Sequence, residues 1–129
     1  MREILTSPNL PAPRFRYSPL VKTGPFYQTA GMIALDPATG NLATGGVAGE
    51  TRQILANLRR VMPDFGLTLE HLVSATIYTT DFDRFSDINR AWEEVFTADV
   101  VPPARTAIGV SALPLRASVE IEFRFYREA

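Results

Sequence analysis

Hydrophobic and polar residues alternate most regularly near the end of the chain. Between residues 119 and 125 every odd position is apolar, while Glu120, Glu122 and Arg124 occupy the even positions. A period of two is typical of a β-strand that packs one face on a core. The pattern therefore predicts a strand over 119–126 whose even positions line the opposite, more polar face.

Two other stretches have the spacing of amphipathic helices. Their apolar residues recur every three or four positions, at Ile54, Leu55, Leu58, Val61 and Met62, and again at Phe85, Ile88, Trp92, Val95 and Phe96. Each set predicts a helix with one buried stripe. We expect the segment 63–66, which contains a proline and a glycine, to end the first helix. Asp81 or Asp83 is expected to cap the second.

The remaining apolar stretches are shorter and contain many β-branched and aromatic residues. They predict strands over 17–22, 26–33, 72–80 and 105–110. Thr23-Gly24-Pro25 supplies a turn between the first two, which indicates an antiparallel hairpin. Asp36-Pro37-Ala38-Thr39-Gly40 is a second strong turn signal.

The order of elements is β-β-α-β-α-β-β, with one extra N-terminal strand left open as an option, and prolines within residues 8–13 exclude a helix there. Two amphipathic helices can cover one face of a single mixed sheet, which predicts an α+β sandwich. A chain of this length fits one domain over 1–129. The other sheet face lacks a cover, and the apolar residues Ile108, Val110 and Leu113 suggest that another subunit supplies it.

Composition and charge narrow the classes of function. The 129 residues are 46% hydrophobic and 21% charged, as in an ordinary globular protein. The formal net charge is −1, the pI is about 5.8, and the nearest approach to a basic stripe is the pair Arg14 and Arg16. Because nucleic-acid binders neutralise phosphates, we expect no nucleic-acid partner.

The chain has no cysteine, and His71 is its only histidine. Zinc sites need such ligands, so we expect no metal. A Ser-His-Asp triad would have to use His71, which lies in a polar stretch typical of a solvated turn. No glycine-rich phosphate fingerprint is present, and we expect no cofactor. No run of 18 apolar residues and no apolar leader within 1–8 are found, so we expect a cytoplasmic protein without a membrane partner.

Arg105 is the first candidate for chemistry. Pro102 and Pro103 stiffen the chain just before it. A guanidinium held on a rigid arm suits bidentate binding of a carboxylate. The alternative is an arginine exposed on a strand.

Glu120 and Asn89 are the other two candidates. Glu120 lies on the polar face of its strand, where it is either solvated or lines a cleft near Arg105 and activates a water molecule. Asn89 lies on the apolar helical stripe with Phe85 and Trp92. Its amide needs hydrogen-bond partners, so it either clamps a neighbouring loop or forms part of a pocket wall.

Taken together, these motifs resemble the Rid family, also called the YjgF family, from about residue 17 to residue 125. The resemblance lies in Asp36-Pro37-Ala38-Thr39-Gly40, Thr51-Arg52-Gln53-Ile54-Leu55-Ala56-Asn57-Leu58, Pro103-Ala104-Arg105 and Val119-Glu120-Ile121-Glu122, in this order. It implies a chorismate-mutase-like fold and a homotrimer with clefts between subunits. It also implies hydrolysis of enamines or imines of the 2-aminoacrylate type to 2-keto acids and ammonia, as in a 2-iminobutanoate/2-iminopropanoate deaminase.

The resemblance also assigns roles to individual residues. Arg105 matches the family's substrate-binding arginine, Glu120 its water-positioning carboxylate and Tyr17 its cleft tyrosine. Gly31 matches a backbone contact, and Asn89 the helix asparagine.

Three stretches depart from the family's usual sequence. They are Phe15-Arg16-Tyr17, Ala30-Gly31-Met32 and Ala107. The first departs from Gly-Pro-Tyr, the second from Ser-Gly-Gln, and Ala107 replaces a cysteine or serine beside the substrate. These changes make the expected pocket more apolar and bear on substrate preference.

Three alternatives accompany this hypothesis. The substrate could be a larger unsaturated amino acid such as 2-aminomuconate, since Ala30, Met32 and Ala107 could widen the pocket or make it drier. The protein could instead be a trimer that binds 2-keto acids without turnover. RNA cleavage has also been attached to the family, but the acidic pI and the absence of a basic stripe argue against it.

Overall fold

The alternating stretch near the C-terminus forms the centre of a mixed six-stranded sheet. The structure, a computed structural model, describes residues 1–128. Strand β6 (Val119–Tyr126) pairs antiparallel with β3 (Phe26–Thr29) on one side and β4 (Leu72–Thr79) on the other. Strand β5 (Ala104–Gly109) runs parallel to β4 and forms one edge of the sheet.

A hairpin and a short first strand complete the sheet. Strand β2 (Leu20–Thr23) pairs antiparallel with β3, and β1 (Arg2–Ile4) pairs antiparallel with β2, so the order is β1-β2-β3-β6-β4-β5. Gly24 takes up the left-handed φ of +56° that this tight turn requires. The predicted hairpin and the predicted order of elements are confirmed, and the optional extra first strand is present.

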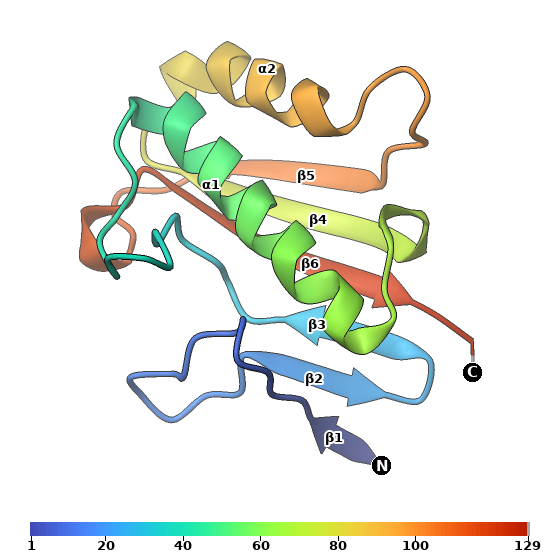
Figure 1. The fold of residues 1–129 in the computed structure, drawn as a ribbon. Helices are drawn as coiled ribbons and strands as arrows, with labels where there is room; N and C mark the ends of the chain where they lie inside the picture. Colours follow the sequence, from blue (N-terminus) through green and yellow to red (C-terminus); the bar gives the residue numbers. More distant parts are fainter. Residues whose placement is uncertain (129) are drawn as a thin grey trace.

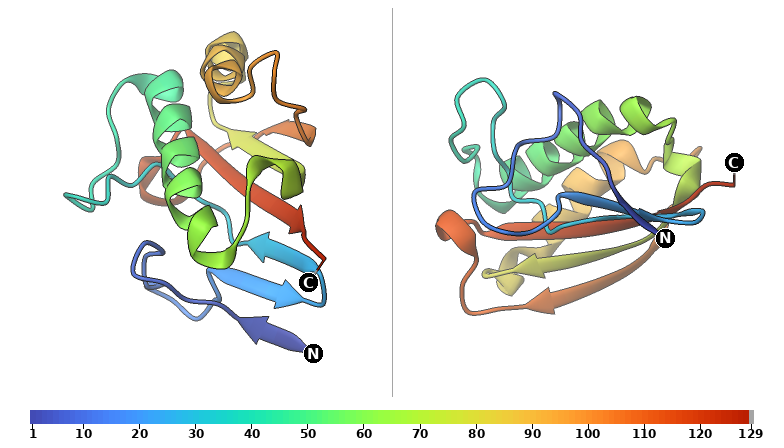
Figure 2. Two further views of the ribbon diagram at one scale, coloured as in Figure 1. Left: turned by 45° about the vertical axis from the view of Figure 1, so that its right-hand side comes forward. Right: turned by 90° about the horizontal axis from the view of Figure 1, so that it is seen from below.

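Two helices, α1 (Gly46–Val61) and α2 (Phe85–Val95), cover the same face of the sheet (Figure 1, Figure 2). Single turns of 3-10 helix lie at Met62–Phe65, Leu69–His71, Phe82–Arg84 and Pro114–Arg116. The core lies between the helices and the sheet, and its most deeply buried side chains include Ile54, Leu58, Ile77, Ile88, Ile121 and Phe123. The predicted α+β sandwich is therefore confirmed.

Several predicted boundaries were wrong. The strand predicted over 17–22 begins at Leu20, because Pro19 accepts a hydrogen bond from Ala30 N but has no N–H to donate in return, so the ladder goes no further. The strand predicted over 26–33 ends at Thr29, and Met32 returns to pair with Ile121 as an isolated bridge.

The expected aspartate cap of the second helix was also wrong. Arg84 precedes α2 without any side-chain cap, and the Asp81 carboxylate instead lies 3.3 Å from Arg84 Nε. Asp81 occupies the N-cap position of the preceding 3-10 turn, but its side chain makes no capping hydrogen bond there either. At the end of α1 the prediction holds, because Gly66 closes the following turn with a left-handed φ of +69°.

The sheet face opposite the helices carries no helix among the described residues. Its side chains include Phe26, Ile108 and Tyr126, which are 54%, 41% and 37% exposed. Phe26 and Tyr126 are register partners on β3 and β6, and their rings meet edge to face at 5.1 Å. Within residues 1–128 no helix is both long and apolar enough to cross a membrane.

Candidate functional site

Arg105 is held in place by helix α2. Its Nη2 donates a hydrogen bond of 2.7 Å to Asn89 Oδ1. Its Cζ lies 5.3 Å from the centre of the Phe85 ring and 5.1 Å from that of the Trp92 ring. Contacts of this kind between a guanidinium and aromatic faces are attractive and fix the plane of the group. The alternative of an arginine exposed on a strand is therefore wrong.

The charge of Arg105 is not neutralised by a neighbouring carboxylate. Within the described part of the chain no Asp or Glu oxygen lies within 4.0 Å of its nitrogens. Burial lowers the pKa of Arg105, and the charge of Glu93 opposes this change. The guanidinium nevertheless stays protonated, because its ordinary pKa is far above neutrality. Since Asn89 uses one of five N–H groups, the others can bind an anion.

The partner of the Asn89 amide oxygen is thus the Arg105 side chain of the neighbouring strand and not a loop. The other alternative, that Asn89 forms part of a pocket wall, stays a prediction. Ala107, the other residue of β5 expected at the site, lies two residues beyond Arg105. It pairs in register with Ile77 and packs against the core.

Glu120 lies on the opposite side of the sheet. Its register partner on β4 is Tyr78, and the odd residues of β6 face the helices, so Glu120 points to the uncovered face. The side chain is half-buried, and burial raises the pKa of Glu120, with the like charge of Glu122 adding to the shift. Glu120 is thus not simply a solvated strand residue.

Gly31 makes room for the Glu120 carboxylate. A Cβ atom at position 31 would lie 2.6 Å from Glu120 Oε2, closer than side-chain contacts allow. Gly31 follows Ala30, whose N–H bonds to the Pro19 carbonyl, and this bond places the segment that contains Tyr17 beside it. Tyr17 is 53% exposed and lines a hollow of about 310 Å³ formed by the N-terminal segment.

The candidate residues thus form two separate groups. Arg105 pairs in register with Ala75, which is buried beneath the helices, whereas Glu120 pairs with Tyr78 on the other face. Strand β4 also separates β5 from β6. Within one chain the structure joins Arg105 with Asn89 and Glu120 with Gly31, but it does not bring Arg105 and Glu120 together.

Sequence reasoning missed some of the surroundings of these groups. Phe85 and Trp92 were expected only as core residues, although they also stack on Arg105. On the uncovered face Glu122 Oε1 accepts hydrogen bonds from Arg124 Nη2 at 2.6 Å and from Tyr78 Oη at 3.2 Å. The alternation of β6 put Glu122 and Arg124 on this face, but nothing in the sequence indicated Tyr78 as their partner.

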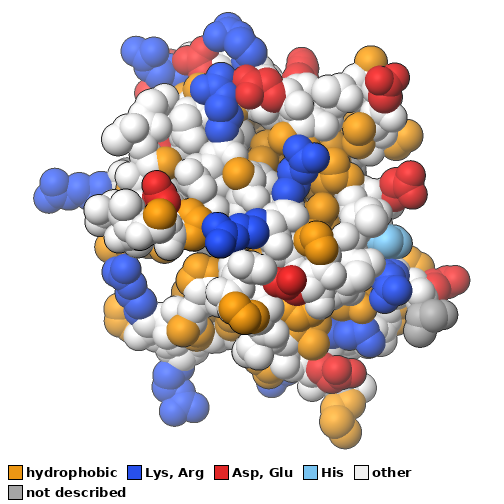
Figure 3. Space-filling model, viewed as in Figure 1, with side chains coloured by type: hydrophobic (Ala, Val, Ile, Leu, Met, Phe, Trp, Pro, Cys, Tyr) orange, Lys and Arg blue, Asp and Glu red, His pale blue; other side chains and the backbone are white. Residues whose placement is uncertain are grey.

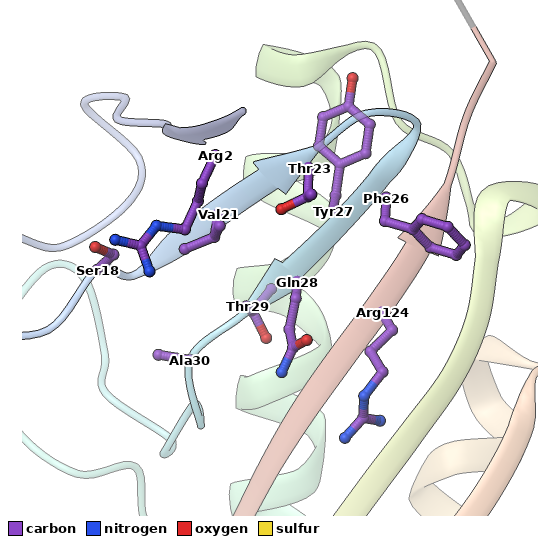
Figure 4. A pocket seen from close by; sticks show the side chains of 10 residues that line it. All are labelled: Arg2, Ser18, Val21, Thr23, Phe26, Tyr27, Gln28, Thr29, Ala30 and Arg124. Atoms are coloured by element: carbon purple, nitrogen blue, oxygen red, sulfur yellow. The ribbon is translucent and has the colours of Figure 1, made fainter.

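A hollow of about 470 Å³ lies on the face of β2 and β3 near this cluster (Figure 4). Gln28 and Arg124, which are register partners, line it together with Arg2, and neither Arg105 nor Glu120 does. Within residues 1–128 no three His, Cys, Asp or Glu side chains are grouped as metal ligands would be. His71 instead completes a capping box, its Nδ1 accepting a hydrogen bond from Thr68 N at 3.0 Å.

Comparison with known proteins identifies the family. The family model described as Endoribonuclease L-PSP matches residues 7–124. A RutC family protein of Pyrococcus horikoshii is 35% identical over 128 residues, covering 99% of this chain and 100% of the relative. The 2-iminobutanoate/2-iminopropanoate deaminase of Bos taurus is 34% identical over 122 residues, covering 95% and 88%.

Solved structures agree with the sequence relatives. The Rid family protein YyfA of Yersinia pestis superposes with a TM-score of 0.90 at 30% identity, covering 98% of this chain and 99% of that one. The YjgF gene product of E. coli gives 0.89 at 30% identity, with the same coverage. The chain therefore belongs to the Rid family, which also includes the YjgF and RutC proteins.

Proposed function

We propose that this protein is a deaminase that hydrolyses small 2-imino acids, and the enamines in equilibrium with them, to 2-keto acids and ammonia. The observation that carries this proposal is Arg105, an unneutralised guanidinium held by Asn89, Phe85 and Trp92. Such a group is suited to bind the carboxylate of a small substrate. The similarity to mammalian proteins named 2-iminobutanoate/2-iminopropanoate deaminase supports the same chemistry.

The reaction needs few groups because an imine carbon is already electrophilic. Arg105 binds the substrate carboxylate, and an enamine tautomerises to the imine. Glu120 takes a proton from a water molecule while the water oxygen bonds to the C=N carbon. Glu120 returns this proton to the nitrogen, which gives a carbinolamine. The hydroxyl proton is then transferred to the nitrogen while the C=O bond forms, the C–N bond breaks and ammonia leaves, so that imine and water give keto acid and ammonia. The raised pKa of Glu120 brings its basicity closer to that of an efficient base near neutral pH.

We further propose that a homotrimer assembles the site, each cleft receiving Arg105, Asn89 and Ala107 from one subunit and Glu120 and Gly31 from the next. Three observations support this arrangement. The two groups lie on opposite faces of one sheet, the uncovered face exposes apolar side chains, and β5 is a sheet edge. Tyr17 would belong to the second group and hydrogen-bond the substrate or close the cleft. No additional cofactor takes part.

The direct test uses an imine generated in the assay by an amino-acid dehydratase, with ammonia release followed in time. Arg105→Ala should lower kcat/KM by about 10–100-fold, the value of a charge-assisted pair of roughly 1.5–3 kcal/mol. Arg90→Ala is the matched control, since Arg90 lies exposed on α2 and its ion pair in the described part of the chain is with Asp87. Equal rates for Arg105→Ala and the wild type would refute the carboxylate contact.

Mixing two inactive variants tests the shared cleft. In a mixed trimer of Arg105→Ala and Glu120→Gln, some clefts receive the intact arginine of one subunit and the intact glutamate of the other. A random one-to-one mixture that is dissociated and reassembled should recover about a quarter of the clefts. No recovery in a mixture that light scattering shows to be trimeric would mean that both residues act from the same subunit.

Ala30, Met32 and Ala107 favour a second candidate, a deaminase for a larger substrate such as 2-aminomuconate. All three lack the polar groups usual in the family, and the small side chain of Ala107 lies two residues beyond Arg105 on the same face of β5. Turnover should then be faster on 2-aminomuconate than on 2-aminoacrylate. Equal or faster turnover of the smaller substrate would contradict this candidate. Stabilisation by 2-keto acids without ammonia release from either substrate would favour a binding protein instead.

RNA cleavage finds less support in the surface of the protein. The helix-covered side shows acidic and basic side chains interspersed without a continuous basic stripe (Figure 3). The net charge is −1. Nucleic-acid affinity comes largely from neutralised phosphates, so we expect no RNA binding at physiological salt.

A further inference from the structure

Glu50 is a buried carboxylate that the proposed reaction does not use. It lies on α1, is only 4% exposed, and its Oε1 accepts hydrogen bonds from Ser118 N at 2.8 Å and from Val119 N at 3.2 Å. Both amides belong to the entry into β6, directly before Glu120. Without Glu50 the buried N–H of Val119 and the partly buried N–H of Ser118 would lose their acceptor, which is costly.

The segment that Glu50 holds follows a strained turn. Leu115 and Arg116 have φ values of +54° and +59°, which side chains other than glycine adopt only at a cost. After this turn the Ser118 carbonyl accepts hydrogen bonds from Thr80 N at 3.1 Å and from Thr79 Oγ1 at 2.8 Å. Ser118 is therefore fixed through its N–H by α1 and through its carbonyl by the end of β4.

We infer that Glu50 is the positioning residue that sets the entry of β6 and thereby holds the Glu120 carboxylate against Gly31. This inference rests on the proposed function only in the role it gives to Glu120. The Glu120 carboxylate lies directly against the Gly31 backbone, because a Cβ atom at position 31 would be only 2.6 Å from Glu120 Oε2. A small shift of the strand entry would move the carboxylate out of this position into water.

The groups around Glu120 define what such a shift would change. Glu122 on the same strand adds a like charge, Tyr78 faces Glu120 from β4, and Arg124 neutralises Glu122 from β6. Glu50 itself lies on the helix side of the sheet and is not among the groups that shift the Glu120 pKa. A change at Glu50 therefore reaches Glu120 through the backbone and not through direct charge repulsion.

The test compares Glu50→Ala, Glu50→Gln and the control Thr29→Val. The Thr29 hydroxyl oxygen also accepts a hydrogen bond from a buried β6 amide, that of Phe123, at 3.0 Å, but farther from Glu120. The pKa of Glu120 is measured by ¹³C NMR titration of glutamate-labelled protein, with the signal assigned by its absence in Glu120→Gln. The kcat/KM for 2-iminopropanoate is measured against pH on the same four proteins and the wild type.

We expect Glu50→Ala to lower the Glu120 pKa towards the ordinary glutamate value, to move the acidic limb of kcat/KM in the same direction and to lower kcat about tenfold or more. Glu50→Gln keeps an acceptor oxygen and should restore both readouts. Thr29→Val should lower Tm without moving either. An unchanged Glu120 titration in a folded Glu50→Ala protein would overturn the inference while leaving the deaminase intact. An inactive wild type would overturn the deaminase, and the NMR titration would still decide the role of Glu50.

Discussion

Arg105 and Asn89 form a hydrogen bond of 2.7 Å between the edge strand β5 and helix α2. This bond fixes the direction of a cation that forms no ion pair with any Asp or Glu among residues 1–128. The Asn89 amide suits this role, because its oxygen accepts a hydrogen bond from the guanidinium without neutralising the positive charge. A carboxylate at the same position would form an ion pair and compete with the substrate.

This relationship predicts the effect of Asn89→Asp. The new carboxylate should pair with Arg105 and raise KM for a 2-imino acid by about 10-fold or more. Asn89→Leu should instead lower kcat/KM through a poorly aimed arginine, with a smaller rise in KM. Steady-state kinetics of both variants check this, with Ser86→Asp, an exposed α2 position, as the control for added charge. The reverse ranking of the two KM values would contradict the prediction.

Gly31→Ala tests the close fit on the other side of the sheet. The added Cβ would meet Glu120 Oε2 at 2.6 Å, so the carboxylate has to move. A displacement of this size should lower kcat/KM by about 10–100-fold. Gly109→Ala is a matched control, because its Cβ would lie at an ordinary 3.5 Å from the Phe82 ring. A fully active Gly31→Ala protein would show that the position of Glu120 does not matter for turnover.

Glu120→Gln should make the protein more stable at neutral pH. The pKa of Glu120 is raised by burial, so its protonated form is favoured in the folded state. Stability from this group is present below the ordinary glutamate pKa of about 4.3 and is lost as pH rises through the folded value. The variant should therefore have a higher Tm than the wild type at pH 7, and the difference should shrink below pH 4. Thermal unfolding across this range, with exposed Glu3→Gln as control, measures the effect; a constant difference would contradict it.

Arg116→Gly should relieve backbone strain in the turn before β6. Glycine adopts the φ of +59° freely, and after its own entropic cost the gain should be about 0.5–1 kcal/mol, or roughly 2–4 °C in Tm. Arg116→Ala keeps the strained backbone and should leave Tm unchanged. Calorimetry of the two variants decides between strain and a contact of the arginine side chain, since the latter would make both less stable.

The sequence predicted the elements and their order because each has a strong local pattern. The alternation over 119–126 defined β6 to the residue, and the helical stripes located α1 and α2. The strand boundary at Leu20 depended instead on Pro19, which has no N–H for the ladder. The boundary at Thr29 depended on long-range contacts, since Met32 returns to pair with Ile121 only as an isolated bridge, and no local pattern contains this.

The candidate residues were also found, but not their spatial relations. Alternation showed that Glu120 faces away from the core, whereas the orientation of Arg105 depends on the register of β5 against β4. The pairing of Asn89 with Arg105 requires that α2 cross over β5, and the sequence does not contain this geometry. For the same reason the separation of Arg105 from Glu120 became visible only in three dimensions.

The stacking of Arg105 on Trp92 has a practical consequence. Trp92 is the only tryptophan in the chain, and its indole also stacks on Phe96 at 4.4 Å. A nearby cation perturbs the excited state of an indole, and an anion that binds to this cation partly cancels its field. The unlabelled protein therefore contains its own fluorescent reporter, and its emission under selective excitation should follow occupancy of the Arg105 site directly.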